Sequence, residues 1–331
     1  MFIKRNKVNA ILVTVMMVSV FLTCFCGPAQ AELWEYPFVY TVNDGEAQIL
    51  LYYTESREQR EVIIPDTIGG YPVTSIINGC FSNMSGCITS ITLPKGVSHT
   101  GSFLGQYALS EVIIPNSVTT IDDNAFSGCS KIFIMDIPEN VKSIGDEAFA
   151  LCSGLMGFTG GQGVTMIGDA AFRGCAGLRD YEIPKGVTTI GDETFFGCTS
   201  MRSITIPKGI TSIGKDAFYH SGLNTITFES PETEIYDSKD TIPEETKIIG
   251  YPSSTAEDYA KKYNREFQDI NDTGDKSGSD SAKVMIGAIV LLGVLCLGLS
   301  IKLAAVIKQN KELVNGNTVE VGETTVEEPL S

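Results

Sequence analysis

The stretch Leu178–Met201, LRDYEIPKGVTTIGDETFFGCTSM, decides how this chain of 331 residues folds. Apolar residues alternate up to Ile183, and the proline after it cannot donate a hydrogen bond to a sheet, so the segment predicts a short strand that ends there. A second β-branched segment ends at Ile190. Asp192 then stands where it would cap a short helical segment that contains Phe195. The stretch predicts one coil made of two short strands and a helical turn.

The pattern of this coil returns every 23 residues between residues 62 and 230, which predicts about seven coils. About eight inward side chains per coil, at ~2 kcal/mol each, do not offset the ordering of one repeat at ~1.5 kcal/mol per residue. Each coil must therefore pack against its neighbours, so the chain is a solenoid. The period is clearest in a phenylalanine column and a cysteine column: Phe103, Phe126, Phe149, Phe172, Phe195, Phe218, Cys129, Cys152, Cys175 and Cys198.

The recurring residues give the consensus L-x-x-I-x-I-P-x-x-V-x-x-I-G-D-x-A-F-x-G-C, which resembles the BspA-like leucine-rich repeats. The resemblance implies a curved leucine-rich-repeat solenoid of parallel β strands with short helical or turn segments. It also implies a surface protein that binds ligands or acts in adhesion. Residues 158–163 lack the Ile-Pro pair and Gln106 stands in the cysteine column, so we expect local changes of strand register at these copies.

Both ends of a solenoid expose unpaired edges that need covering. Tyr40–Val42 and Ala47–Tyr53 alternate on either side of an Asn-Asp-Gly-Glu turn and predict an N-terminal hairpin cap. Ser254 and Glu257 have the spacing of a capping box and predict a C-terminal helical cap. The two caps are expected at residues 32–61 and 231–267.

The ends of the chain carry signals for export and membrane anchoring. Residues 1–31 have a basic start, an apolar segment and a final Ala-Gln-Ala, which is the pattern of a signal peptide. Residues 283–307 include 18 consecutive residues without a charge and predict one transmembrane helix after a polar linker, 268–282. Lysines beyond this span predict a cytoplasmic tail, 308–331. The sequence thus predicts a single-pass protein of the plasma (cell) membrane with its N-terminal domain extracellular.

The charge, the histidines and the missing motifs argue against several classes of function. The chain has 24 Lys and Arg against 40 Asp and Glu, a formal net charge of −16, so we expect no nucleic-acid partner. Its two histidines, His99 and His220, stand in different copies and are expected on solvated loops. The glycine run at 157–163 lacks the Lys-Ser/Thr of a phosphate loop and predicts a turn. With no Ser/His/Asp or paired-carboxylate pattern, the sequence predicts no enzyme and no cofactor.

The cysteine column has three possible roles. Equivalent side chains of stacked coils point in parallel, which does not suit disulfides, and a ladder does not converge on a point as zinc ligands do. We therefore expect the four cysteines of the column to be buried free thiols that pack as small apolar side chains. Cys80 lies off the period, so a disulfide between Cys80 and Cys87 stays open.

A column of aspartates offers a second possible metal site. Four like charges about 5 Å apart would repel one another unless a cation such as calcium lay between them. Lys215 occupies this position in the next copy, which favours the other interpretation, that each aspartate caps a local helical turn. We therefore expect no metal. The column consists of Asp123, Asp146, Asp169 and Asp192.

The outward side of the first strands is the candidate binding site. Alternate residues of a strand face opposite sides of a sheet, so the polar residues before the proline position stack coil on coil into a ladder that faces solvent. We expect a protein or glycan ligand to bind this ladder. Its members are Thr92, Asp136, Thr159, Asp180, Glu182, Thr205 and Thr227.

The sequence predicts a membrane-anchored extracellular recognition module that binds a protein or glycan without catalysis. The alternative is a structural or scaffolding component of the cell envelope, since seven coils at ~4.8 Å stack to only about 34 Å and keep the module close to the membrane. A hydrolase is a third hypothesis, which no residue pattern supports.

Overall fold

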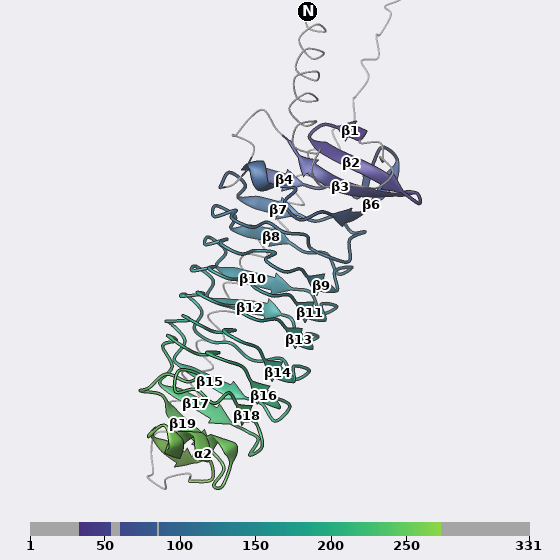
Figure 1. Cartoon of the computed structure of the whole chain (residues 1–331). Helices are drawn as coiled ribbons and strands as arrows, with labels where there is room; N and C mark the ends of the chain where they lie inside the picture. The colour runs from purple at the N-terminus through teal and green to yellow at the C-terminus, as the bar shows by residue number, and fades with distance from the viewer. Residues whose placement is uncertain (1–32, 54–59, 85, 273–331) are drawn as a thin grey trace, which may run out of the picture.

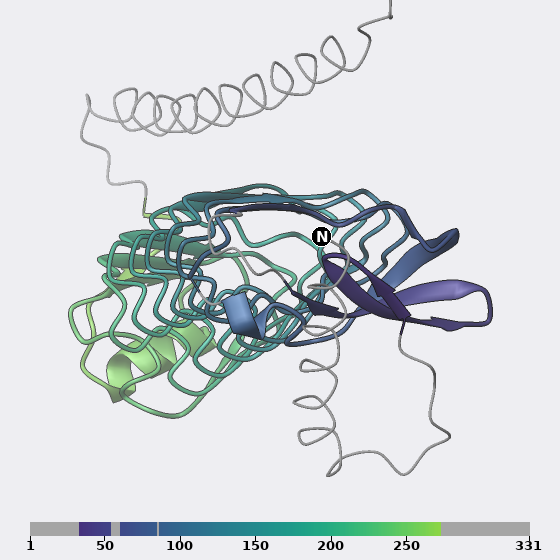
Figure 2. The same cartoon turned by 90° about the horizontal axis from the view of Figure 1, so that it is seen from above.

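The computed structural model describes residues 33–53, 60–84 and 86–272. They form a column of stacked coils with short strands along two of its sides (Figure 1). Seen down the column, the coils lie over one another around a common interior (Figure 2). No helix within these ranges is long and apolar enough to span a membrane. The predicted signal peptide, transmembrane helix and cytoplasmic tail, and the linker beyond residue 272, lie outside the described residues.

The first strands of the coils are short and run parallel to one another. They are β4 (Glu61–Ile63), β7 (Ser90–Thr92), β8 (Glu111–Ile113), β10 (Ile134–Ile137), β12 (Gly157–Gly160), β15 (Ser203–Ile206), β17 (Thr225–Phe228), β19 (Lys247–Gly250) and β20 (Phe267–Asp269). They form three sheets, β4-β7-β8, β10-β12 and β15-β17-β19-β20. Asp136 pairs with Thr159 one repeat later, so the period of the sequence becomes the register of the sheet. The parallel ladder continues beyond residue 230 through β19 and β20.

The second strands form another parallel ladder on the neighbouring side of the column (Figure 1). They are β9 (Thr120–Ile121), β11 (Ser143–Ile144), β13 (Met166–Ile167), β14 (Thr189–Ile190), β16 (Ser212–Ile213) and β18 (Glu234–Ile235). They pair in two sheets of three strands, β9-β11-β13 and β14-β16-β18. In each strand the isoleucine points to the core, and the residue before it faces outward.

The two ends of the column differ from its middle. At the N-terminal end, β1 (Leu33–Glu35), β2 (Phe38–Asn43), β3 (Glu46–Tyr52), β6 (Tyr71–Ile76) and β5 (Thr67–Ile68) form one sheet in this order, and β2 and β3 make an antiparallel hairpin. A short 3-10 helix, η1 (Ser82–Met84), follows. At the C-terminal end, Ser254 Oγ accepts a hydrogen bond from the Glu257 N–H at 3.2 Å and begins α2 (Thr255–Lys262).

Phenylalanine rings fill the interior, as the sequence predicts. From Phe103 to Phe218, the centroids of successive rings lie 5.5–5.8 Å apart, and the planes of neighbouring rings are within 20° of parallel. Tyr52 and Phe81 continue the row toward the N-terminal end. Because each ring contacts the ring of the next coil, the core is continuous along the column.

The strand predicted around Ile183 does not form, so that prediction was wrong. Residues 178–184 have no regular secondary structure. The inward position of the first strand carries Phe158 in one coil and Tyr181 in the next, and their ring centroids lie 5.3 and 5.0 Å from that of Phe172. Two successive aromatic rings need more room than the isoleucine found at this position in β15. We attribute the loss of backbone pairing to them.

The aspartates hold successive coils together instead of capping helices, which corrects the sequence prediction. The segments that follow them are turns. Asp146 Oδ1 accepts a hydrogen bond from the backbone N–H of Asp169 at 2.8 Å, and three equivalent bonds span 2.6–2.9 Å. We call these four bonds the aspartate staples. They run from Asp123 to Asp146, Asp146 to Asp169, Asp169 to Asp192 and Asp192 to Lys215.

The glycine before each stapled N–H leaves room for the carboxylate. A Cβ atom on Gly168 would collide with Asp146 Oδ1 and would lie 2.6 Å from Asp146 N. The glycines at 145, 191 and 214 meet the preceding aspartate in the same way. The glycine of the recurring Ile-Gly-Asp triplet is therefore needed because successive coils approach each other closely at this point.

We expect Gly168→Ala to lower the free energy of unfolding by about 1–3 kcal/mol, because the new methyl group displaces the Asp146 carboxylate and the backbone beside it. Urea denaturation measures the change. Gly209→Ala is the matched control, since a Cβ atom there meets its nearest atoms at 3.5 Å, an ordinary contact. Equal losses in the two variants would show that the staple is not sterically tight.

The turn after each core phenylalanine requires a left-handed backbone. Its column contains Leu151, with φ +59° and a side chain that is 62% exposed. A residue with a Cβ atom pays about 1–2 kcal/mol in this region, whereas glycine is free to adopt it. Glycines occupy the position in four other coils with φ from +69° to +78°: Gly105, Gly128, Gly174 and Gly197.

We expect Leu151→Gly to raise the free energy of unfolding by about 0.5–1 kcal/mol. The gain is the relieved left-handed strain, reduced by the larger backbone entropy of glycine in the unfolded chain. Chemical denaturation measures it. Gly128→Ala is the converse variant and should lose a similar amount, because its Cβ atom would have ordinary contacts and only φ opposes it. A stability loss in Leu151→Gly would mean that the leucine side chain itself stabilises the coil.

The cysteine column lies in the core as free thiols, as predicted. Cys152 Sγ donates a hydrogen bond to the carbonyl of Phe126 in the preceding coil at 3.0 Å, and the other three thiols do the same at 3.0–3.4 Å. Gln106, which replaces a cysteine in this column, donates from Nε2 to the carbonyl of Phe81 at 2.9 Å. The column therefore supplies a donor to a buried carbonyl, and an amide can serve in place of the thiol.

Candidate functional site

The residues predicted to bind a ligand lie on the outer side of the first strands. We call this surface the first-strand face and define it by Thr92, Asp136, Thr159, Asp180, Glu182, Thr205 and Thr227. All seven are exposed or half-buried, whereas the strand residues that alternate with them are buried or pack against the core. Parallel register places the residues of successive coils side by side wherever the strands pair.

The structure brings two pairs of these residues together. Thr159 Oγ1 donates a hydrogen bond to Asp136 Oδ1 at 2.6 Å, and this bond fixes both side chains on the face. Thr205 and Thr227 are direct partners in the register of β15 and β17. The first pair therefore presents a carboxylate bound to a hydroxyl group, and the second presents two hydroxyl groups, at neighbouring positions of the ladder.

Thr92 has a different environment from the other predicted residues. Its register partners are Ile63 and Ile113, which are 66% and 46% exposed. The neighbours of Thr92 in its own row are therefore apolar, whereas the row of Glu61, Ser90 and Glu111 beside it is polar.

Asp180 and Glu182 lie in the coil whose first strand is missing. Both side chains are exposed, and neither makes an ion pair or a side-chain hydrogen bond with a described residue. The middle of the first-strand face thus carries two unneutralised carboxylates. Carboxylates in this state attract basic groups over a distance set by the ionic strength.

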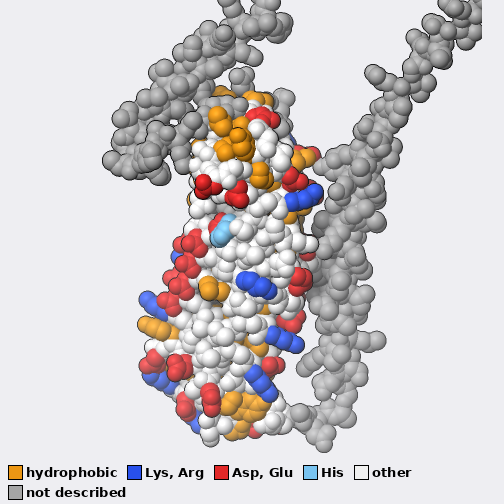
Figure 3. All heavy atoms as spheres, turned by 90° about the vertical axis from the view of Figure 1, so that its right-hand side faces the viewer, with side chains coloured by type: hydrophobic (Ala, Val, Ile, Leu, Met, Phe, Trp, Pro, Cys, Tyr) orange, Lys and Arg blue, Asp and Glu red, His pale blue; other side chains and the backbone are white. Residues whose placement is uncertain are grey.

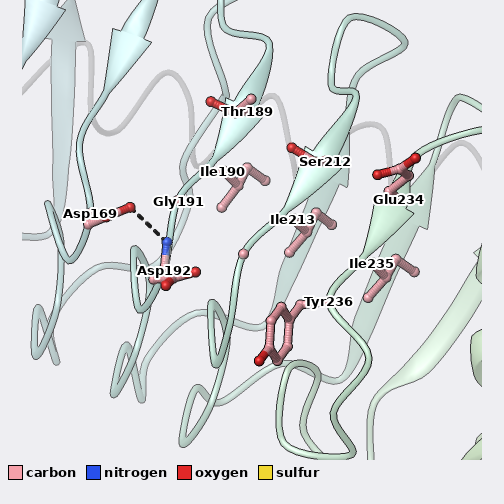
Figure 4. Close-up of a pocket in the computed structure, with 11 residues that line it drawn as sticks. Asp169, Thr189, Ile190, Gly191, Asp192, Ser212, Ile213, Glu234, Ile235 and Tyr236 are labelled. Atoms are coloured by element: carbon pink, nitrogen blue, oxygen red, sulfur yellow. Dashed lines mark hydrogen bonds between the residues drawn. The ribbon is translucent and has the colours of Figure 1, made fainter.

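A groove of about 410 Å³ crosses β14, β16 and β18 on the second ladder (Figure 4). Thr189, Ser212 and Glu234 stand in one row because they occupy equivalent positions of the three strands. Tyr236, which is 49% exposed, lies on the opposite side of the groove, and Asp169 lines its edge. The groove offers hydroxyl, carboxylate and aromatic groups to solvent.

The surface over the second ladder is largely uncharged along its middle, with acidic and basic side chains gathered toward its edges (Figure 3). Threonine or serine holds the outward position in four of the second strands, β9, β11, β14 and β16. Some hydroxyl groups of the strip hold the coils together, since Thr211 Oγ1 donates a hydrogen bond to the carbonyl of Thr188 at 3.0 Å. The strip therefore stabilises the contact between coils and also presents a polar surface.

A second groove, of about 690 Å³, contains His99 and Asp122. The two side chains meet at 2.8 Å between Nδ1 and Oδ1, and Asp122 Oδ2 accepts the backbone N–H of Gly101 at 2.8 Å. The carboxylate thus orients the imidazole ring. The sequence prediction of an isolated histidine on a loop missed this pair, because His99 stands in a copy that is shorter than the others.

The described residues contain no group of three or more His, Cys, Asp or Glu side chains arranged to hold a metal ion. No disulfide joins Cys80 and Cys87 in this structure. Burial raises the pKa of the core thiols, to about 12 for Cys152 and Cys198. A thiol that stays protonated and hydrogen-bonded in the core is a structural group.

The residues that the sequence analysis missed lie where the repeat pattern ends. Glu234 and Tyr236 come after Phe218, the last member of the phenylalanine column, and no consensus position marks them. They are identified by the strand register of the structure, which pairs Glu234 with Ser212 one coil earlier.

Several solved bacterial leucine-rich repeat structures are similar to this chain. A Treponema pallidum leucine-rich repeat protein is 20% identical and matches over 72% of this chain and 98% of its own, with a TM-score of 0.47. One from Bacteroides ovatus is 22% identical over 70% and 75%, with a TM-score of 0.44. A leucine-rich cell surface protein from Faecalibacterium prausnitzii is 19% identical over 76% and 96%, with a TM-score of 0.30.

None of the curated proteins matches the chain significantly. The family model described as "BspA type Leucine rich repeat region (6 copies)" matches residues 52–179 and 165–239. These ranges cover more than half of the chain and contain the phenylalanine column, the cysteine column and the aspartate staples. The chain belongs to the family of BspA-type leucine-rich repeat proteins.

Proposed function

We propose that this protein is a non-catalytic recognition module on the outer side of the plasma membrane, held there by one transmembrane helix, and that its first-strand face binds a protein or glycan. The proposal rests on the observation that one set of side chains holds the coils together while another set faces solvent. Inward residues and the aspartate staples hold the coils together, whereas the polar residues of the first-strand face are displayed to solvent in successive coils.

The core chemistry supports a binding role over a catalytic one. The four thiols of the cysteine column are buried donors to backbone carbonyls. The aspartates at the coil edges accept backbone N–H groups of the next coil. The cysteines and aspartates of these two columns are thus engaged in stabilising the solenoid.

The acidic charge of the first-strand face favours a ligand with basic groups. We expect Asp136→Ala, Asp180→Ala and Glu182→Ala together to weaken binding at least tenfold at low salt, because three carboxylates leave the face at once. The difference from the unchanged protein should shrink as salt screens the remaining attraction. The measurement is a titration of the full chain in lipid nanodiscs with the ligand that it selects from a matrix-protein panel and a glycan array.

A matched control removes the same charge elsewhere: Glu232→Ala, Glu244→Ala and Glu245→Ala, three exposed residues beyond the last core phenylalanine. This variant should bind as the unchanged protein does. Equal affinity of both triple variants would place the ligand away from the first-strand face. Co-purification of envelope components alone, with no soluble ligand, would favour the scaffolding function instead.

A further inference from the structure

A cluster of aromatic side chains lies on the surface where three coils turn. The position after the core phenylalanine holds Leu104, Ser127 and Ala150 in earlier coils. In the next three coils this position holds Arg173, Phe196 and Tyr219. We call the group formed there, with two neighbouring residues, the aromatic cluster: Arg173, Phe196, Tyr219, Glu193 and His220.

The rings of the aromatic cluster contact one another. The His220 ring lies over that of Tyr219, with centroids 4.0 Å apart and planes 32° apart. Phe196 meets Tyr219 and His220 edge to face at 5.6 and 5.7 Å. His220 is exposed, whereas the other two rings are half-buried, so they form a ledge with the imidazole outermost.

The backbone of His220 adopts a conformation that favours glycine. Its φ is +55°, and it occupies the turn column in which Gly174 and Gly197 stand in the two preceding coils. A side chain at this φ costs about 1–2 kcal/mol. Leu151 has the same backbone conformation in this column, so the feature that distinguishes His220 is the contact of its ring with that of Tyr219.

The cluster carries polar groups beside its rings. Among the described residues, neither Tyr219 Oη nor a ring nitrogen of His220 has a hydrogen-bond partner. Arg173 lies 5.1 Å from the centroid of the Phe196 ring and forms an ion pair with Glu193 at 3.0 Å. The charges of this pair cancel, which leaves the Tyr219 hydroxyl and the His220 nitrogens to contact a ligand.

We propose that the aromatic cluster binds a neutral saccharide. A sugar ring has an apolar C–H face, which packs on the electron-rich face of an aromatic ring, and a rim of hydroxyl groups, which need donors and acceptors. The rings of Tyr219 and His220 supply the aromatic face. The donors and acceptors are Tyr219 Oη, the His220 nitrogens and the Arg173–Glu193 pair. This site is separate from the first-strand face, and the proposal stands without the function assigned to that face.

Charge argues against two other ligand classes. A quaternary ammonium group would need the aromatic faces free of cations, but Arg173 already lies over Phe196. An acidic ligand would meet a guanidinium that Glu193 neutralises, on a chain with a net charge of −16. A neutral ligand with an apolar face and polar rim fits both observations.

The test is calorimetric titration of the full chain in lipid nanodiscs with neutral hexasaccharides of glucose, galactose, mannose and N-acetylglucosamine. We expect at least one to bind, and His220→Gly to weaken it at least tenfold. The variant restores the residue that this turn column usually carries, so it keeps the fold. Leu151→Gly is the matched control, because it makes the same kind of change in the same column three coils away, and it should bind as the unchanged chain does.

A chemical readout locates the site. The bound hexasaccharide should slow acylation of His220 by diethyl pyrocarbonate, measured by mass spectrometry, and should leave the rate at His99 unchanged. Binding of none of the four hexasaccharides below a Kd of about 10 mM overturns the proposal. So does a saccharide that binds His220→Gly as tightly as the unchanged chain.

Discussion

Phe172→Ala should lower the free energy of unfolding by about 3–5 kcal/mol, through lost burial and the cavity left behind. The Phe172 side chain has no exposed surface. Its ring centroid lies 5.8 Å from that of Phe149 and 5.5 Å from that of Phe195 in the adjacent coils. Phe158 and Tyr181 approach it from the first-strand position at 5.3 and 5.0 Å. Urea denaturation of the full chain, followed by circular dichroism, measures the loss.

The same experiment tests whether the coils unfold together. Because the row of rings is continuous from Tyr52 to Phe218, we expect one transition, shifted to lower urea in the variant. Phe133→Ala is the control, since this phenylalanine is 51% exposed and should change the free energy of unfolding by less than about 1 kcal/mol. A loss below about 1 kcal/mol for Phe172→Ala would contradict the continuous core.

The protein should lose stability steeply above about pH 9. Burial raises the pKa of the thiols in the cysteine column, whereas an unfolded cysteine has a pKa of about 8.5. Above that value the unfolded chain has released protons that the folded chain keeps, so rising pH favours unfolding. Each thiol then costs about 1.4 kcal/mol per pH unit until its folded pKa is reached, near 12 for Cys152 and Cys198. Denaturation midpoints between pH 7 and 11 measure the slope.

Cys152→Ala is the control for this slope, because it removes one titrating thiol and should make the pH dependence shallower whatever its effect on stability at pH 7.

Alkylation mapped by mass spectrometry gives a second readout of the burial of these thiols. The four thiols of the column should react only after denaturation, whereas Cys87, which is half-exposed, should react in the folded protein. Disulfides among the four core cysteines would contradict both expectations.

Much of the fold follows from the 23-residue period, because inward positions of a solenoid repeat with the coil. The phenylalanine and cysteine columns are inward for this reason. The aspartates were harder to interpret, since a helix cap and a bond to the next coil require the same residue beside the same glycine. Only the position of the neighbouring backbone, where the Asp169 N–H meets Asp146 Oδ1, distinguishes the two. The strand missing beside Tyr181 depends on two large rings meeting in space.

The candidate sites were predictable to different degrees. The first-strand face follows from alternation along a strand, so its residues could be named from the sequence. In the groove beside Tyr236, the second-strand residues Thr189 and Ser212 could also be named from the period, whereas Glu234 and Tyr236 could not, because they come after the repeat pattern ends. The aromatic cluster had a signal in the column after the core phenylalanine, where Ser127 and Ala150 give way to Phe196 and Tyr219.

The aspartate staples give the solenoid a polarity along its axis. In every staple the acceptor belongs to the earlier coil and the donor to the later one, and the thiol bonds have the same direction, as between Cys152 and the Phe126 carbonyl. A chain is synthesised from its N-terminus. Each new coil therefore meets a preceding coil whose acceptors are already in position, and it completes that coil's bonds as it docks. Backbone bonds at the same turns run in the opposite sense, as between the Phe126 N–H and the Ala148 carbonyl, so each coil presents both acceptors and donors to the coil that follows it.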